Sequence, residues 1–327
     1  MKILHISFHK GCQNDIQFVC DALGHTLEYM TFEDGVTQGN ARYNIGHWRA
    51  EQCWNTYKDY FNTFDLILTS DTTPISRVFL QNNFQKKLVV WICNRFDYYD
   101  QSHLDCAFPD GAYYDLIRSI PSRPNVTMIS NCAFENVYLQ MRGIYFKNEV
   151  IKPIGGVSSV YAEVDHVPVE RKGERFWIPQ YHNETKLMNL SQKLDELGIL
   201  NYNGRHGGLQ DLALFKGILC IPYAWSTLSL FESIQIGMIY FLPSLDFLIE
   251  LSRTGDFWFQ PPFERNILMI SEWYCEENKE VFVYFNSWAD LQEKVTSTDY
   301  EEKKRQVLRF ADAHKKTHLE RWRRVLC

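Results

Sequence analysis

The chain has 327 residues, of which 45% are hydrophobic and 15% aromatic, and its formal net charge is -6 at pH 7. This length and composition are typical of packed globular domains and leave room for two α/β domains. Acidic and basic residues are interspersed, so the sequence predicts no nucleic-acid partner, and no apolar run approaches the ~18 to 20 residues of a membrane span.

The nine cysteines are dispersed from Cys12 to Cys327 without any Cys-x-x-Cys pair, and the N-terminal residues do not form a signal peptide. This usage predicts reduced thiols and a cytoplasmic protein. No Asp-x-Asp pair and no cysteine cluster occurs. We therefore expect neither a bound metal nor a cofactor, and the sequence leaves the oligomeric state open.

The first half of the chain alternates short apolar runs with amphipathic segments. The patterns predict strands at 2–8, 25–32, 64–70, 88–93 and 126–130, and helices at about 15–23, 48–60, 110–120 and 133–142. Such alternation is typical of an α/β domain with a parallel sheet. Gly11 lies in the first turn, but a single glycine is not a dinucleotide-binding fingerprint, so NAD binding is not predicted.

Two groups of polar residues follow strands of this half. His9 comes directly after the first strand, and Asn94, Arg95, Asp97 and Tyr98 follow the fourth. Polar and aromatic side chains together suit a carbohydrate, which offers both hydroxyl groups and apolar faces. The alternative for the second group is a surface loop whose tyrosines pack on a neighbouring element.

The stretch from Gly204 to Ser244 organises the second half. It predicts strands at 217–222 and 238–242, joined by a loop and by an amphipathic helix that ends on Gly237. In an open parallel sheet, ligands bind beyond the carboxyl ends of the strands. Ser226, Thr227 and Ser229 can cap the helix near Leu228, and the free N–H groups of a helix start favour an anion such as a diphosphate.

This stretch, with Ser229, Glu232 and Gly237 at the spacing S-x-x-E-x-x-x-x-G, resembles the donor-binding end of GT-B-type glycosyltransferases. The resemblance implies two Rossmann-like domains that face each other across a cleft. Residues 1–155 would bind the acceptor, with the C-terminal helix 306–327 packed back on them, and residues 156–305 would bind the nucleotide-sugar donor. One departure is Ala224, which stands where retaining members commonly have a second glutamate.

The resemblance also implies roles for single residues. Glu232 would bind donor hydroxyls, Lys186 would neutralise the diphosphate, and Arg205 and His206 would compensate for Tyr181, which stands where the family has an arginine. His9 is the first candidate for the base that activates the acceptor, and Asp97 is the second. The full set of expected contacts comprises, for the donor, Gly11, Lys186, Arg205, His206, Ser226, Thr227, Leu228, Ser229 and Glu232, and, for the acceptor, Asn94, Arg95 and Tyr98.

The sequence thus predicts a metal-independent transferase. It would move a sugar from a nucleotide-diphosphate sugar, with UDP or GDP as the nucleotide, to a glycan or another hydroxyl acceptor. Two alternatives stay open: a GT-B-like epimerase that acts on the nucleotide sugar itself, and a non-catalytic protein that holds a nucleotide or a glycan.

Overall fold

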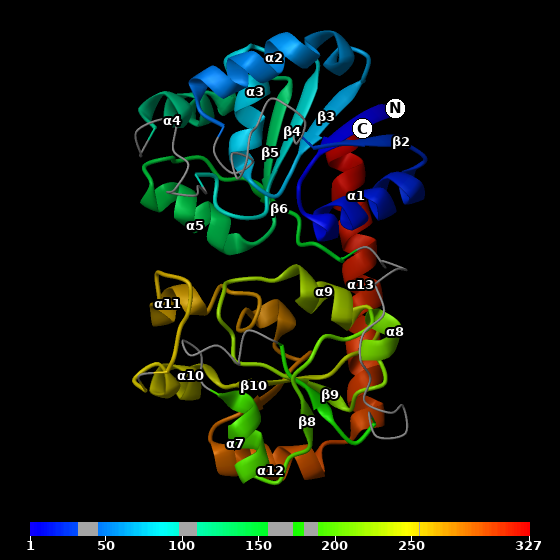
Figure 1. The fold of residues 1–327 in the computed structure, drawn as a ribbon, viewed down its shortest axis with the longest axis vertical. Helices are drawn as coiled ribbons and strands as arrows, with labels where there is room; N and C mark the ends of the chain where they lie inside the picture. Colours follow the sequence, from blue (N-terminus) through cyan, green and yellow to red (C-terminus); the bar gives the residue numbers. More distant parts are fainter. Residues whose placement is uncertain (32–44, 98–109, 156–172, 180–188, 255) are drawn as a thin grey trace. The chain divides into compact units, whose positions relative to one another are not determined.

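The computed structural model describes residues 1–31, 45–97, 110–155, 173–179, 189–254 and 256–327. The chain divides into two compact units (Figure 1). The first comprises Met1–Gly156 and Thr317–Cys327, and the second comprises Val157–Lys316. Each unit contains its own parallel sheet with helices packed on it, so the predicted α/β class is confirmed.

The sheet of the first unit has the order β2-β1-β3-β4-β5-β6, and all its pairs are parallel. Its strands are β1 (Lys2–Ile6), β2 (Thr26–Met30), β3 (Leu66–Thr69), β4 (Lys87–Ile92), β5 (Val126–Ser130) and β6 (Glu149–Val150). Its helices are α1 (Lys10–Leu23), α2 (His47–Phe61), α3 (Arg77–Gln81), α4 (Gly111–Arg118) and α5 (Ala133–Met141). Helix α1 begins earlier than the predicted residue 15, because the side chain of His9 caps it.

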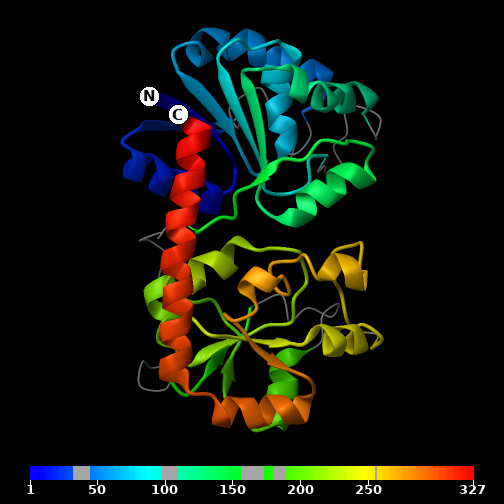
Figure 2. The same ribbon diagram turned by 180° about the vertical axis from the view of Figure 1, so that it is seen from behind.

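Both faces of this sheet are buried. Leu4 and Ile6 of β1 point into one core, which α2 and α3 cover. Side chains alternate along a strand, so Ile3 points to the opposite face, where α1 packs (Figure 2). On that face Trp91 of β4 also meets Trp322 edge to face, with ring centroids 5.5 Å apart. Strands that are buried on both faces have continuous apolar runs rather than alternating ones, as β3 and β4 do here.

The second unit has a sheet of order β11-β10-β9-β7-β8, again parallel throughout. Its strands are β7 (Phe176–Trp177), β8 (Asn201–Tyr202), β9 (Gly217–Leu219), β10 (Tyr240–Pro243) and β11 (Val283–Phe285). Its helices are α7 (Leu190–Glu196), α8 (Leu209–Leu212), α9 (Leu228–Ile234), α10 (Leu245–Leu251), α11 (Arg265–Leu268), α12 (Trp288–Ser297) and the first part of α13 (Tyr300–Leu326).

The two sheets share one topology. In each, the first strand along the chain lies between the second and the third, so the strand order reverses between β1 and β3 and again between β7 and β9. Ligands of open α/β sheets bind beyond the carboxyl ends of the strands at such a switch point. We therefore expect ligand-binding residues in the loops after β1 and β3 in one unit, and after β7 and β9 in the other.

The packing of helix α13 differs from the expectation that residues 306–327 pack on the first domain. Only Thr317–Cys327 belongs to the first unit. Val307 and Ala311 are buried in the core of the second unit together with Phe231 of α9. Gly237, at a φ of 77°, lets the end of the α9 segment approach Leu308 closely, since a Cβ there would lie 3.1 Å from the Leu308 Cγ. Apolar residues along the whole helix thus divide it between the two units.

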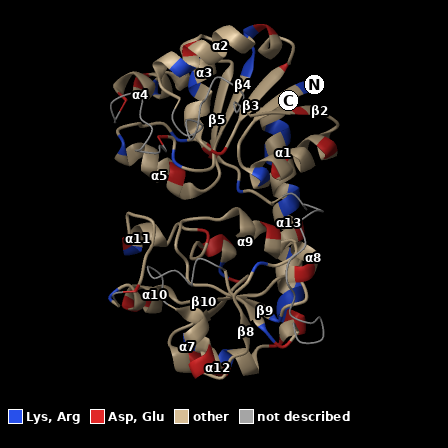
Figure 3. Cartoon of the chain, in the orientation of Figure 1, with Lys and Arg blue, Asp and Glu red and all other residues tan. Residues whose placement is uncertain are grey.

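Among the described residues, no helix combines the length and the apolar character that a membrane crossing requires. Lysine and arginine are intermixed with aspartate and glutamate on the helices of each unit (Figure 3). This distribution agrees with the mixed charge pattern of the sequence.

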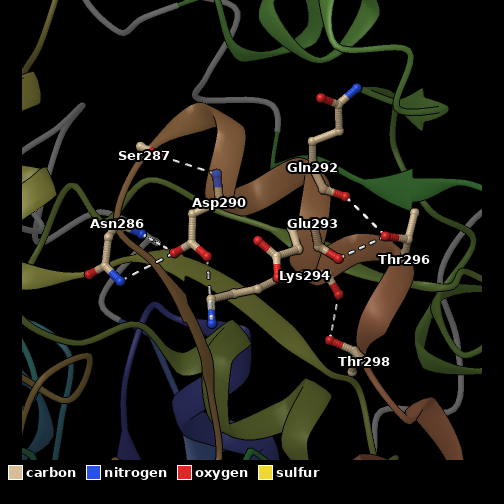
Figure 4. Close-up of polar contacts among 8 residues, drawn as sticks. All are labelled: Asn286, Ser287, Asp290, Gln292, Glu293, Lys294, Thr296 and Thr298. Carbon is tan, nitrogen blue, oxygen red and sulfur yellow. Dashed lines mark hydrogen bonds and ion pairs between the residues drawn. The ribbon is translucent and has the colours of Figure 1, made fainter.

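Helix α12 illustrates how local residues define the elements (Figure 4). Ser287 Oγ accepts a hydrogen bond from the backbone N–H of Asp290 at 3.1 Å, and Asp290 Oδ2 accepts one from the N–H of Asn286 at 2.7 Å. The first N–H groups of a helix lack acceptors within it. The side chains of Ser287 and Asp290 supply acceptors for backbone N–H groups at this helix start.

Ser287→Ala should lower the free energy of unfolding by about 1 kcal/mol, because the N–H of Asp290 loses its acceptor. The measurement is chemical denaturation of the variant and the wild type. Ser297→Ala, at the exposed end of the same helix, is the matched control and should change stability by less than about 0.5 kcal/mol. Equal losses in both variants would contradict the capping role.

Candidate functional site

In the first unit, His9 follows β1 at the switch point and is exposed. Its Nδ1 accepts a hydrogen bond from the backbone N–H of Gly11 at 3.1 Å, which makes His9 the N-cap of α1. A neutral ring that accepts at Nδ1 carries its proton on Nε2. His9 can therefore take a proton from an acceptor hydroxyl only when the ring leaves the cap or the proton on Nε2 moves elsewhere.

The other histidine of this edge, His5, has a different environment. It is fully buried within β1, and its Nε2 lies 2.8 Å from the Oγ of Ser70. Burial lowers the pKa of His5 to about 3, so the ring stays neutral at pH 7. His5 is a structural residue, and His9 is the histidine of this edge that faces solvent.

Three residues that were not predicted as site residues form a cluster at this edge, in which Cys12 contacts His9, and Cys93 and Asp71 interact with Cys12. Cys12 is in the first turn of α1, Asp71 follows β3, and Cys93 follows β4 directly. The hydrogen bond with the Cys93 thiol, and then that with His9, lower the pKa of Cys12 to about 7, although burial acts in the opposite direction. Asp71 has a φ of 70°, an unusual backbone conformation for a residue with a side chain. Their positions in the sequence could have indicated this cluster, since all three residues follow strand ends of one sheet.

The predicted acceptor residues after β4 are largely engaged with the protein itself. Arg95 is 8% exposed, pairs with the buried carboxylate of Glu135, and lies with its guanidinium carbon 4.5 Å from the centre of the Phe134 ring. Burial raises the pKa of Glu135, against the effect of Arg95. Asn94 is partly exposed, whereas Tyr98 lies outside the described residues. These contacts hold Arg95 in place behind the strand end.

Asp97 is also buried, at 5% exposure. Its Oδ2 accepts a hydrogen bond from the hydroxyl of Tyr114 at 2.5 Å and lies 3.5 Å from the Nε of Arg142. A carboxylate with two such partners is positioned to stabilise the loop. Its role as the second candidate base stays a prediction, with the added condition that Asp97 would have to exchange these partners for an acceptor.

In the second unit, the loop between β9 and α9 is fixed by three backbone contacts. The carbonyl oxygens of Tyr223, Ala224 and Trp225 accept hydrogen bonds from Gln260 N at 2.8 Å, Trp273 Nε1 at 2.7 Å and Glu272 N at 2.9 Å. Each donor belongs to a segment far away in the sequence. The loop at this switch point is therefore held in one conformation before any ligand binds.

Helix α9 begins after this loop. Of the three predicted caps, Thr227 performs the function, since its Oγ1 accepts from the N–H of Leu230 at 3.3 Å. Ser229 is exposed and donates to Thr227 Oγ1 at 3.3 Å, and Leu228 is the first helical residue. The Oγ of Ser226 is buried and has no hydrogen-bond partner among the described residues. A buried hydroxyl group without a hydrogen bond lowers the stability of the fold, so the loop is a candidate for ligand contact.

Glu232 lies in the second turn of α9 and is partly buried. It lies near Tyr240 of β10: burial chiefly raises the pKa of Tyr240, and the Glu232 carboxylate adds to the effect. Glu232 thus projects from a helix whose Leu230 and Phe231 are buried in the core. A carboxylate anchored in this way can accept hydrogen bonds from two neighbouring hydroxyl groups.

The loop after β8 contains the two predicted cations. Arg205 is exposed. His206 packs against Trp177, with ring centroids 5.1 Å apart, and its Nδ1 lies 3.2 Å from the N of Gly208. Burial lowers the pKa of His206, so the ring is neutral at pH 7 and supplies no positive charge to a diphosphate. Arg205 is the cation of this loop, and Lys186 lies outside the described residues.

No family model and no curated protein matches the chain. Solved structures do match it along its length. Arabidopsis thaliana UGT89C1, complexed with UDP, matches at 10% identity and a TM-score of 0.50, with all of both chains covered. Sucrose-phosphate synthase from Thermosynechococcus elongatus matches at 14% identity and a TM-score of 0.47, over 98% of this chain and 99% of that one. A putative UDP-N-acetylglucosamine 2-epimerase from Listeria monocytogenes matches at 12% identity and a TM-score of 0.46, over 98% and 97%.

The fold is of the GT-B type. At these identities the likeness establishes the fold alone, and it confirms the fold that the sequence resemblance predicted. Within this GT-B fold, His9, Gly11 and the residues after β4 lie at the carboxyl edge of the first sheet, while Ser226 to Glu232 follow β9 of the second. The assignment of acceptor and donor to the two units stays a prediction.

Within the part of the chain that the structure describes, no group of three or more histidine, cysteine, aspartate or glutamate residues is arranged to hold a metal ion.

Proposed function

We propose that the protein transfers a sugar from a nucleotide-diphosphate sugar to a hydroxyl group of a glycan or a related acceptor, without a bound metal or cofactor. The observation that carries the proposal is the position of Glu232. It lies on the helix that follows β9, at the switch point of the second sheet of a GT-B fold. The UDP in the matched UGT89C1 structure supports a uridine nucleotide as the first choice, ahead of GDP.

The chemistry divides between the two units. In the second unit, Glu232 would accept hydrogen bonds from vicinal hydroxyls of the donor, and Ser226, Ser229 and the exposed Arg205 are the groups that would contact its phosphates. In the first unit, His9 would take the proton of the acceptor hydroxyl once its ring has left the cap of α1. The cytoplasm remains the proposed compartment.

Glu232→Gln tests the donor site. The amide keeps the size of the side chain but weakens the charged hydrogen bonds, so UDP-sugar affinity should fall by about 1.5 to 3 kcal/mol, or about ten- to a hundred-fold. The measurement is calorimetry, with a melting curve for each protein. Glu250→Gln, an exposed glutamate on α10 of the same unit, is the matched control and should leave the dissociation constant unchanged.

An unchanged dissociation constant in Glu232→Gln would remove this residue from the site. Failure of the wild-type protein to bind any of UDP, GDP and their sugar conjugates would contradict the proposal as a whole. Two further experiments separate the alternatives. If the protein is incubated with a nucleotide sugar and no acceptor, an inverted sugar carbon detected by NMR would identify an epimerase. If the nucleotide sugar binds but is not turned over in the presence of any acceptor, the protein is non-catalytic.

A further inference from the structure

The buried cysteines of the first unit fall into two chemical classes. Cys20 and Cys53 are both buried, and burial is the main reason that the pKa of each is raised to about 12. A thiol of that kind stays protonated at neutral pH and is inert, because the thiolate is the reactive form. Cys12 is equally buried, at 1% exposure, yet its surroundings act in the opposite direction.

The difference is a second thiol. Cys12 lies in the first turn of α1 and Cys93 lies just past the end of β4, and their side chains are in hydrogen-bond contact. The backbone N–H of Asp71 contacts the Cys93 sulfur, and the side chain of His9 contacts Cys12. Two thiols from separate elements, an imidazole and a backbone donor therefore meet at the carboxyl edge of one sheet. Both cysteines are reduced in this structure, and Cys93 is partly exposed.

We propose that Cys12 and Cys93 form an oxidant-sensitive dithiol that closes to an intramolecular disulfide beside His9. Two features of the site support this chemistry. The contacts around Cys12 favour its thiolate, with a pKa of about 7, and a resolving thiol is already in contact with it. Cys20, eight residues further along the same helix, has no such partner among the described side chains.

The oxidant is a small peroxide, with hydrogen peroxide as the probe. The Cys12 thiolate attacks one oxygen, the O–O bond breaks, and hydroxide leaves and is protonated to water, so that Cys12 becomes a sulfenic acid. The Cys93 thiol then attacks the Cys12 sulfur, the S–O bond breaks, and a second water leaves. Two thiols and one peroxide thus give one disulfide and two waters, and dithiothreitol reverses the reaction.

Closure of the disulfide changes the surroundings of His9. The sulfurs must approach to about 2.05 Å, and the disulfide removes the thiolate that His9 contacts. Resting on the proposed function, this would make the dithiol a redox control of the acceptor-side site.

Peptide mapping tests the proposal without any nucleotide sugar. The wild-type protein is treated with a small excess of hydrogen peroxide, denatured in N-ethylmaleimide, and digested without reduction. We expect the Cys12–Cys93 disulfide as the main oxidation product, while Cys20 and Cys53 are recovered as maleimide adducts. Because the thiolate is the attacking form, the rate should rise with pH and reach half of its maximum near pH 7. Recovery of Cys12 and Cys93 as maleimide adducts to the same extent as Cys20 would overturn the proposal.

Two variants sharpen the result, each checked by a melting curve. Cys93→Ser leaves Cys12 without its resolving thiol, so dimedone should trap a sulfenic acid at Cys12 that the wild-type protein does not accumulate. Cys20→Ser is the matched control and should form the disulfide as the wild type does. A disulfide between Cys12 and another cysteine in the wild type would count against the pairing. Because mapping involves no substrate, its failure is distinguishable from failure of the transferase proposal.

Discussion

Asp15→Ala is expected to lower the free energy of unfolding by about 3 to 5 kcal/mol, the largest effect on stability that we predict for a single residue. Asp15 of α1 is fully buried. Its Oδ2 accepts hydrogen bonds from the N–H groups of Ile154 at 2.8 Å and Gly155 at 2.9 Å, and its Oδ1 lies 3.1 Å from the Nε2 of His318. This last contact between Oδ1 and Nε2 is short but does not have hydrogen-bond geometry.

His318 has two partners in the first unit. Its Nδ1 lies 2.8 Å from the carbonyl oxygen of Lys152, which can only accept, and its Nε2 faces the Asp15 carboxylate. The buried ring of His318 therefore lies between a backbone acceptor and a side-chain carboxylate. Removal of Asp15 leaves two buried N–H groups without acceptors and the buried ring of His318 without its carboxylate partner, and this is why the expected loss is large.

Chemical denaturation of the variant and the wild type measures the loss. Asp21→Ala is the matched control, since Asp21 is exposed near the end of the same helix and its Oδ1 accepts a hydrogen bond from the side chain of Gln17. It should cost less than about 1 kcal/mol. The double variant Asp15→Ala, His318→Ala should lose less than the sum of the two single variants, because each single change leaves the other group unpaired. A loss in Asp15→Ala no larger than that of Asp21→Ala would show that the buried pair contributes little.

Replacement of His9 should have the largest effect on activity. If His9 takes the acceptor proton, His9→Ala should lower turnover by roughly 100-fold or more while donor affinity stays near that of the wild type. The same change also removes the cap of α1, which by itself costs about 1 kcal/mol of stability. A loss of turnover in the alanine variant alone would therefore have two explanations.

The variant His9→Asn separates the loss of the base from the loss of the helix cap. Asparagine is a good N-cap, so it keeps a side-chain acceptor for the Gly11 N–H, but it has no group that can act as a base at neutral pH. Turnover should stay low in His9→Asn while the melting temperature returns to the wild-type value. His47→Ala, at the exposed start of α2, is the control and should change neither quantity. Recovery of turnover in His9→Asn would assign His9 to capping and leave Asp97 as the candidate base.

The sequence allowed prediction of the elements and of their class because those depend on local chemistry. Continuous apolar runs predicted β1, β3 and β4, and the Ser/Thr cluster before Leu228 predicted the start of α9. The end of α9 was predicted at Gly237, but the helix ends at Ile234. The GT-B fold was predicted from the spacing of Ser229, Glu232 and Gly237, which is a local pattern as well. The site was predicted only as a set of separate loop residues. Their contacts, such as Arg95 with Glu135 or Asp97 with Tyr114, were not.

The predicted start of α1 was wrong because histidine is an uncommon N-cap. The division of α13 between the units was not predicted, because both units bury residues of one continuous helix. By itself, then, the sequence determined the alternation of strands and helices, the turns that separate them, and which residues lie at strand ends. Tertiary structure alone decided that Asp15 meets His318 and that Cys12 meets Cys93. Each of these pairs joins segments far apart in the chain, and their proximity depends on strand order and helix packing, which the free energy of the whole fold sets rather than any local pattern.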